Sequence, residues 1–106
     1  MDEFGVKALE LKVFTMPTCS SCSAAKQIAF EVAKKLGLAY REVDMNTREG
    51  LAEGLAHQII SAPSITLGDE VIVVGHLISK EKLEEEVRRR LEKWRARASL
   101  ETPKER

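Results

Sequence analysis

The sequence predicts an α/β fold in which a mixed four-stranded sheet lies between helices, in the order β-α-β-α-β-β-α. Short apolar runs rich in β-branched residues alternate with longer segments of helical periodicity, and a glycine-containing turn separates the last two runs. A chain of 106 residues with 43% hydrophobic residues also suits one hydrophobic core. We expect a single domain over residues 1–98 and a polar tail over residues 99–106 that frays into solvent.

The first part of the chain reads as a strand, a helix and a second strand. Leu9 to Thr15 alternates apolar and polar residues, as a partly buried strand does, and Pro17 ends it. Ser20 to Leu36 carries apolar residues at helical spacing, with lysines in its last turn and Gly37 as a stop. Leu38 to Asp44 reads as the second strand. The helix between the two strands makes them parallel.

A short second helix is expected from Thr47 to about Ile59. Leu51, Leu55 and Ile59 recur every four residues, which is typical of one helical face. Gly50 and Gly54 weaken this helix by up to ~1 kcal/mol each. We therefore expect it to be short and frayed.

The last part of the chain reads as a hairpin followed by a helix. Ser64 to Leu67 and Val71 to Val74 are apolar runs joined by Gly68-Asp69-Glu70, which predicts antiparallel strands. Ser79 is a suitable N-cap for the final helix. That helix carries one narrow apolar stripe, made of Leu83, Val87, Leu91 and Trp94.

Charge and hydropathy exclude several classes of partner. Seventeen Lys and Arg balance seventeen Asp and Glu, so we expect neither nucleic acid nor an anionic membrane surface as a partner. The apolar runs are far shorter than the ~20 residues that span a bilayer, and residues 1–5 are acidic where a signal peptide is basic. We expect a cytoplasmic monomer that does not bind membranes.

The chain has two cysteines, and their spacing suggests chemistry rather than structural support. A disulfide between Cys19 and Cys22 would close almost no chain, so it would add little to stability. We expect Cys19 at the N-cap of the first helix, where unpaired amide groups and the helix dipole favour a thiolate. Lowering its pKa from ~8.5 to ~7 takes about 2 kcal/mol, which these two effects supply without a catalytic histidine. Cys19 is then the attacking thiolate and the more buried Cys22 the resolving thiol.

Three motifs together resemble those of the thioredoxin and glutaredoxin superfamily. They are the segment Thr15 to Cys22 after the first strand, Ser61-Ala62-Pro63-Ser64 before the third strand, and Val74-Gly75 before the last helix. The similarity runs from about Leu9 to Trp94. It implies the thioredoxin fold and the activity of a thiol-disulfide oxidoreductase that reduces protein disulfides.

The resemblance also implies a set of substrate-binding residues. A cis peptide bond between Ala62 and Pro63 would face the cysteines and leave the Ala62 backbone free to pair with an extended client segment. Gly75 would let the client backbone approach the same groove, and Pro17 and Thr18 precede the attacking cysteine. The implied partners are disulfide-containing client proteins and an electron-donating reductase. Neither a cofactor nor a metal is implied.

The sequence departs from thioredoxins around the cysteine pair. Thioredoxins usually carry Trp before the first cysteine and Gly-Pro between the two, where this chain has Thr18, Ser20 and Ser21. The redox potential is therefore left open. The two serines are candidates to modulate the thiolate through their hydroxyls, although serine is also an ordinary residue for starting a helix.

Two further departures concern proton transfer and glutathione. The buried acid of thioredoxins falls on Val13 here, which leaves Glu42 or Asp44 as substitutes for proton transfer with Cys22. The segments that bind glutathione in glutaredoxins have no evident counterpart in this chain. We therefore expect a reductase rather than glutathione as the electron donor.

Two alternatives from other functional classes stay open. The cysteine pair also suits a module that binds a soft metal or an iron-sulfur cluster. Soft-metal chaperones of this kind carry Met two positions before the first cysteine, where this chain has Pro17, and His57 and His76 are distant in sequence as further ligands. A thioredoxin-fold interaction module that keeps its cysteines without turnover is the second alternative.

Overall fold

The computed structural model describes residues 9–101, with side chains through residue 96. Four strands and three helices follow the predicted order: β1 (Glu10–Thr15), α1 (Cys22–Leu36), β2 (Ala39–Asp44), α2 (Arg48–Ala56), β3 (Ser64–Leu67), β4 (Glu70–Val73) and α3 (Lys80–Glu101). The predicted α/β class with a mixed four-stranded sheet is confirmed. Among residues 9–101, no helix combines the length and apolar character that a membrane span requires.

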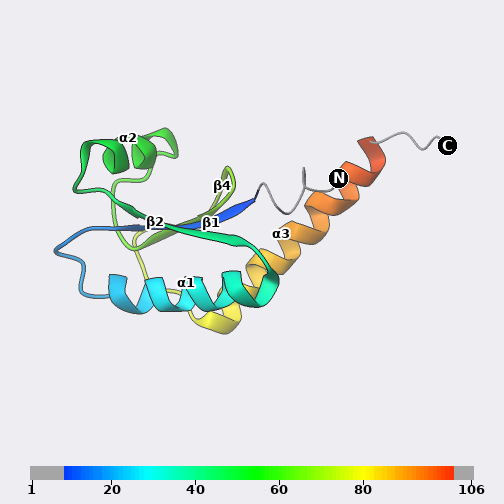
Figure 1. Cartoon of the computed structure of the whole chain (residues 1–106), viewed down its shortest axis with the longest axis horizontal. Helices are drawn as coiled ribbons and strands as arrows, with labels where there is room; N and C mark the ends of the chain where they lie inside the picture. Colours follow the sequence, from blue (N-terminus) through cyan, green and yellow to red (C-terminus); the bar gives the residue numbers. More distant parts are fainter. Residues whose placement is uncertain (1–8, 102–106) are drawn as a thin grey trace.

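The sheet has the strand order β2-β1-β3-β4, with β1 at its centre. β1 and β2 are parallel, whereas β3 is antiparallel to both β1 and β4. Figure 1 shows α1 and α3 on one face of this sheet and α2 on the other. The carboxyl ends of β1 and β2 therefore point to the same edge, where the chain turns into α1 and α2.

Each face of the sheet has its own apolar cluster because side chains alternate along β1. Leu11 and Val13 face α1 and α3 and belong to the larger cluster, together with Ala29 and Leu83. Phe14 points to the other face, in a smaller cluster whose remaining buried members are Val43, Met45 and Ile59.

The ends of α1 follow from its sequence. At the C-terminal end Gly37 adopts φ +70°, and its N–H donates to the carbonyls of Ala33 and Lys34. At the N-terminal end the helix begins at Cys22, two residues later than predicted. The delay has a physical cause, because Cys19 N–H donates to Met16 O (3.1 Å) and the intervening residues form a turn.

α2 shows the largest difference from the predicted packing. The helix ends at Ala56, short of Ile59, and Leu51 and Leu55 are exposed rather than core residues. Gly50 and Gly54 form its buried side. A Cβ on Gly54 would lie 2.7 Å from the Met45 sulfur, so glycine allows α2 to approach the chain that follows β2.

The hairpin and the last helix agree with the sequence. β4 begins at Glu70, so Gly68 and Asp69 form the turn, and Gly68 has φ +58°. Ser79 caps α3 by accepting a hydrogen bond from Lys82 N–H at 3.1 Å. The helix continues to Glu101, three residues beyond the predicted domain boundary, and residues 102–106 of the predicted tail lie outside the described residues.

Candidate active site

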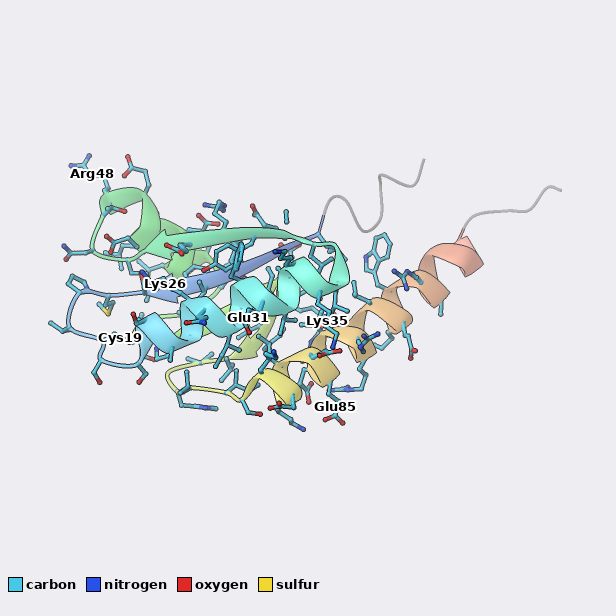
Figure 2. All side chains as sticks on the ribbon, turned by 60° about the horizontal axis from the view of Figure 1, so that its bottom comes forward. Cys19, Lys26, Glu31, Lys35, Arg48 and Glu85 are labelled. Atoms are coloured by element: carbon cyan, nitrogen blue, oxygen red, sulfur yellow. A yellow bond between two sulfur atoms is a disulfide. The ribbon has the colours of Figure 1, made fainter. Side chains whose placement is uncertain are left out.

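Cys19 and Cys22 lie where the chain leaves β1 and enters α1. Figure 2 shows Cys19 at the beginning of the first helix. The two residues form a disulfide, with their Cα atoms 5.5 Å apart. Cys22 is the first residue of α1, and Cys19 lies in the turn before it. This junction places both sulfurs at the edge of the sheet to which β1 and β2 point.

The two cysteines differ in exposure. Cys22 is 5% exposed, because the first turn of α1 packs on the sheet, whereas Cys19 is partly exposed. A client disulfide can therefore reach Cys19 more easily than Cys22. The difference agrees with the roles that the sequence predicts for the two thiols.

The expected N-cap position of Cys19 is wrong, because Ser21 occupies it. Ser21 makes no side-chain capping hydrogen bond, and the first turn contains no acidic residue. The unpaired amides and the positive end of the helix dipole are therefore not neutralised by a local carboxylate. Cys19 approaches this helix end from the preceding turn rather than as part of the helix. Ser20 is exposed in the same turn.

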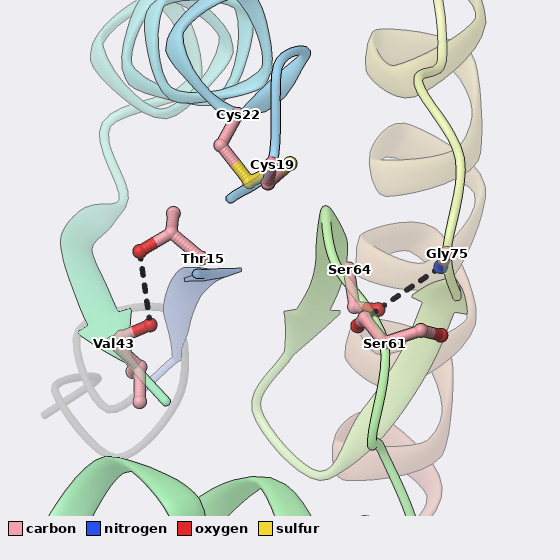
Figure 3. The surroundings of a disulfide bond; sticks show 7 residues. All are labelled: Thr15, Cys19, Cys22, Val43, Ser61, Ser64 and Gly75. Carbon is pink, nitrogen blue, oxygen red and sulfur yellow. Dashed lines mark hydrogen bonds between the residues drawn. A yellow bond between two sulfur atoms is a disulfide. The ribbon is translucent and has the colours of Figure 1, made fainter. Parts of the chain in front are cut away.

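An open cavity of about 330 Å³ lies beside the disulfide. Its lining comes from the end of β1, the cysteine turn, the start of α1 and the end of β2: Thr15, Met16, Pro17, Cys19, Cys22, Ser23, Lys26 and Asp44. Pro17 thus lines the same cavity as both cysteines, whereas exposed Thr18 lies in the turn but not in this lining. Thr15 fastens β1 to β2 here, because its hydroxyl donates to Val43 O (3.4 Å) (Figure 3).

Of the two acids considered as proton-transfer groups, only Asp44 lines this cavity. Its carboxylate accepts a hydrogen bond from Asn46 N–H at 2.9 Å, which fixes the turn after β2. Glu42 instead accepts from the Tyr40 hydroxyl. Val13, which stands in place of the buried acid of thioredoxins, is fully buried among apolar side chains. Lys26 also lines this cavity, although the sequence did not predict it as a site residue. Its position one helical turn after Cys22 is the signal that could have identified it.

The loop before β3 carries the Ala62–Pro63 pair, whose peptide bond is cis. Pro63 is buried and Ala62 half-buried. Ala62 packs on the smaller apolar cluster, as does Met16 from the cysteine turn. The same cluster therefore supports both segments, and this brings the proline loop into the surroundings of the disulfide.

Gly75 joins this region from the segment after β4. Its N–H donates to Pro63 O at 3.0 Å, and its φ is +79°. A Cβ there would lie 2.8 Å from the Ser61 hydroxyl oxygen. The left-handed backbone conformation therefore favours glycine here. The structure thus brings together the three residues that the motifs named at this edge: Ala62, Pro63 and Gly75.

Ser64 belongs to the motif before β3, but its position in the sequence did not predict a role for it. It is fully buried, and its hydroxyl contacts both Ser61 and Gly75 (Figure 3). A hydroxyl directly after a cis proline at the start of a strand is the signal that could have drawn attention to it.

The charged groups with a perturbed pKa lie away from the cysteines. On the α2 side of the sheet, hydrogen bonds from Arg41 and Lys12 hold the pKa of Glu53 below its usual value. On α3, hydrogen bonds from Arg90 and Arg89 lower the pKa of Glu86 to about 2. None of these residues lines the cavity beside the disulfide. Within the described part of the chain, no three His, Cys, Asp or Glu side chains gather as a metal site.

Comparison with known proteins identifies the family. A family model described as a thioredoxin domain matches residues 9–88. A protein named "Probable Thioredoxin" from Archaeoglobus fulgidus is 35% identical over 65 residues, which cover 61% of this chain and 71% of the relative. A thioredoxin from Methanocaldococcus jannaschii is 30% identical over 83 residues, which cover 78% of this chain and 96% of the relative.

The fold is confirmed by solved structures. Thioredoxin 1 from Thermosipho africanus superposes with a TM-score of 0.64 at 17% identity, covering 78% of this chain and 94% of that one. The redox pair at the start of α1 and the sequence matches point to the same chemistry. The chain therefore belongs to the thioredoxin family and is a thiol-disulfide oxidoreductase.

Proposed function

We propose that this protein reduces the disulfides of client proteins, with Cys19 as the attacking thiolate and Cys22 as the resolving thiol. The unequal exposure of the two sulfurs carries the proposal, because the attacking sulfur must meet a client and the resolving sulfur need only meet Cys19. The helix N-terminus next to Cys19 lowers the pKa of a thiol placed there.

The reaction has two thiol-disulfide exchange steps, which break the client disulfide and form the Cys19–Cys22 disulfide. The Cys19 thiolate attacks one sulfur of the client disulfide, a mixed disulfide forms, and one client thiolate leaves and takes up a proton. The Cys22 thiol then gives up its proton, attacks the Cys19 sulfur and releases the second client thiolate, which takes up a proton in turn. The client gains two electrons and two protons, and the Cys19–Cys22 disulfide remains.

The residues around the pair suit the binding of an extended client segment. Ala62 and Pro63 form the platform, and Gly75 lies beside it, because its N–H donates to Pro63 O. Pro17 and Thr18 are exposed and directly precede Cys19, where a client segment would contact them. This platform binds the client segment beside Cys19 and so raises the affinity for a protein client.

Thioredoxins act on disulfide-containing clients and are reduced by reductase partners. We propose the same two partners for this chain, with the reductase rather than glutathione as the electron donor. The cytoplasm is the compartment proposed for this cycle, since thiols are kept reduced there. The protein works as a monomer, because each step needs only one cysteine pair.

Insulin reduction in the presence of dithiothreitol tests the proposal. The wild-type protein should accelerate the reduction of the insulin disulfides severalfold over dithiothreitol alone, and Cys19→Ser should remove the acceleration. A wild-type rate no faster than dithiothreitol alone would contradict the proposal. Stoichiometric copper, zinc or iron in protein purified under reducing conditions would instead support the metal-binding alternative.

A further inference from the structure

The hydroxyl of Ser64 connects the two loops that form the client platform. Ser64 is the first residue of β3, directly after Pro63, and its side chain is fully buried. Its Oγ donates a hydrogen bond to Ser61 O at 2.7 Å and accepts one from Gly75 N–H at 3.1 Å (Figure 3). One hydroxyl therefore joins the loop before β3 to the segment after β4.

The two loops meet nowhere else through a side-chain hydrogen bond among the described residues. The Gly75 N–H also donates to Pro63 O, but this backbone bond fixes Gly75 only against the proline. The Ser64 hydroxyl adds the link to Ser61, on the other side of Ala62. It thus sets the position of Ala62 and Gly75 relative to each other.

We propose that Ser64 is a positioning residue for protein clients. Its hydroxyl holds Ala62 and Gly75 at the spacing that an extended client segment needs, so it acts on client binding and not on the sulfur chemistry. The inference rests on the proposed function, in which these loops bind the client. Small disulfides do not need the platform, so the rate at which they are reduced does not depend on Ser64.

The chain offers a matched control two residues further along the same strand. Thr66 is also fully buried, and its hydroxyl has no hydrogen-bond partner. Thr66→Val removes a buried hydroxyl at nearly constant volume without affecting either loop. Ser64→Ala and Thr66→Val therefore each remove one buried hydroxyl from the same strand, and only the Ser64 hydroxyl contacts the loops.

The test compares kinetics on a protein and on a small disulfide. With dithiothreitol in excess, Ser64→Ala should raise the KM for insulin about three- to tenfold, the loss expected for one or two hydrogen bonds, at unchanged kcat. Its rate with the small aromatic disulfide dithionitrobenzoate and the pKa of Cys19 should match the wild type. Thr66→Val should match the wild type in all these measurements. Ser64→Thr keeps a hydroxyl at this position, so its KM for insulin should be closer to that of the wild type than the KM of Ser64→Ala is.

Each other outcome overturns the proposal. An unchanged KM in Ser64→Ala, in protein shown to be folded by circular dichroism, removes the positioning role while the proposed function stands. An equal loss with insulin and dithionitrobenzoate shows that Ser64 supports the whole site and not client binding. If the wild-type protein does not reduce insulin, the proposed function fails and the role of Ser64 fails with it.

Discussion

At the residue scale, the difference in exposure between Cys19 and Cys22 separates the two half-reactions. Cys22→Ser removes the resolving thiol, so the mixed disulfide between Cys19 and a client should persist. After this variant is incubated with cell extract, non-reducing electrophoresis should show covalent complexes. Dithiothreitol should separate these complexes by reducing the mixed disulfide.

The reciprocal variant is the control for this experiment. Cys19→Ser leaves only the sulfur that is 5% exposed, so it should trap few or no clients. Equal trapping by both variants would show that the two thiols do not have distinct roles.

At the element scale, α2 depends on two glycines whose hydrogens face the sheet. Exchange of glycine for alanine in a helix normally stabilises it by about 1 kcal/mol. A Cβ on Gly50 would overlap the backbone carbonyl of Asp44, and the backbone would have to move. We expect Gly50→Ala to lower the free energy of unfolding by about 1–3 kcal/mol in urea titration.

Exposed Ala52 on the same helix provides the comparison. Ala52→Gly should cost about 1 kcal/mol from helix propensity alone. A Gly50→Ala protein that is more stable than the wild type would show that α2 does not need the close approach.

A charge cluster made of Lys12, Arg41 and Glu53 links α2 to the sheet. The effect of pH on this cluster gives a second prediction at the element scale. Lys12 Nζ lies 2.7 Å from the Glu53 carboxylate, and Arg41 also donates to it. The pKa of Glu53 is lower in the folded state than in the unfolded chain, because Arg41 and Lys12 stabilise its carboxylate. These ion pairs therefore stabilise the folded state fully above the ordinary pKa of ~4.3. Their contribution is lost as the pH falls through the lowered pKa of the folded state. Glu53→Gln should therefore reduce stability at pH 7 and flatten the decline of stability between neutral and acidic pH. Identical pH profiles of the melting temperature for variant and wild type would contradict this account.

At the scale of the whole molecule, we predict that the protein works as a monomer, since one cysteine pair is enough for both steps of the proposed exchange. The chain has a mass of 11.9 kDa and a formal net charge of zero. Sedimentation equilibrium of the reduced protein should give the mass of one chain across a wide range of concentrations. A stable species of twice that mass would contradict the monomer.

Much of this architecture could be predicted from the sequence, because periodicity and turn residues act locally. The order of all seven elements is as predicted, and most boundaries agree within two residues. The motifs at Cys19, Ser64 and Gly75 come together because the sheet brings three distant segments to one edge. The resemblance to a known family made that meeting predictable.

The differences arise where packing overrides local pattern. The four-residue repeat of Leu51 and Leu55 predicts a buried face, but Gly50 and Gly54 take that face because β2 and the following segment lie too close for side chains. The turn after Pro17 displaces the N-cap from Cys19 to Ser21. The Ser64 contact spans 11 residues to Gly75, and no local pattern encodes it.

The most direct test of the central claim is the pH dependence of alkylation of the reduced protein, resolved for each cysteine by peptide mass spectrometry. The account predicts that Cys19 reacts first with iodoacetamide and reaches half its limiting rate near pH ~7, well below the ~8.5 of free cysteine. Cys22 should react only at higher pH and more slowly. Preferential alkylation of Cys22, or half-maximal rates for both thiols at or above the pKa of free cysteine, would contradict the role of Cys19 as the attacking thiolate.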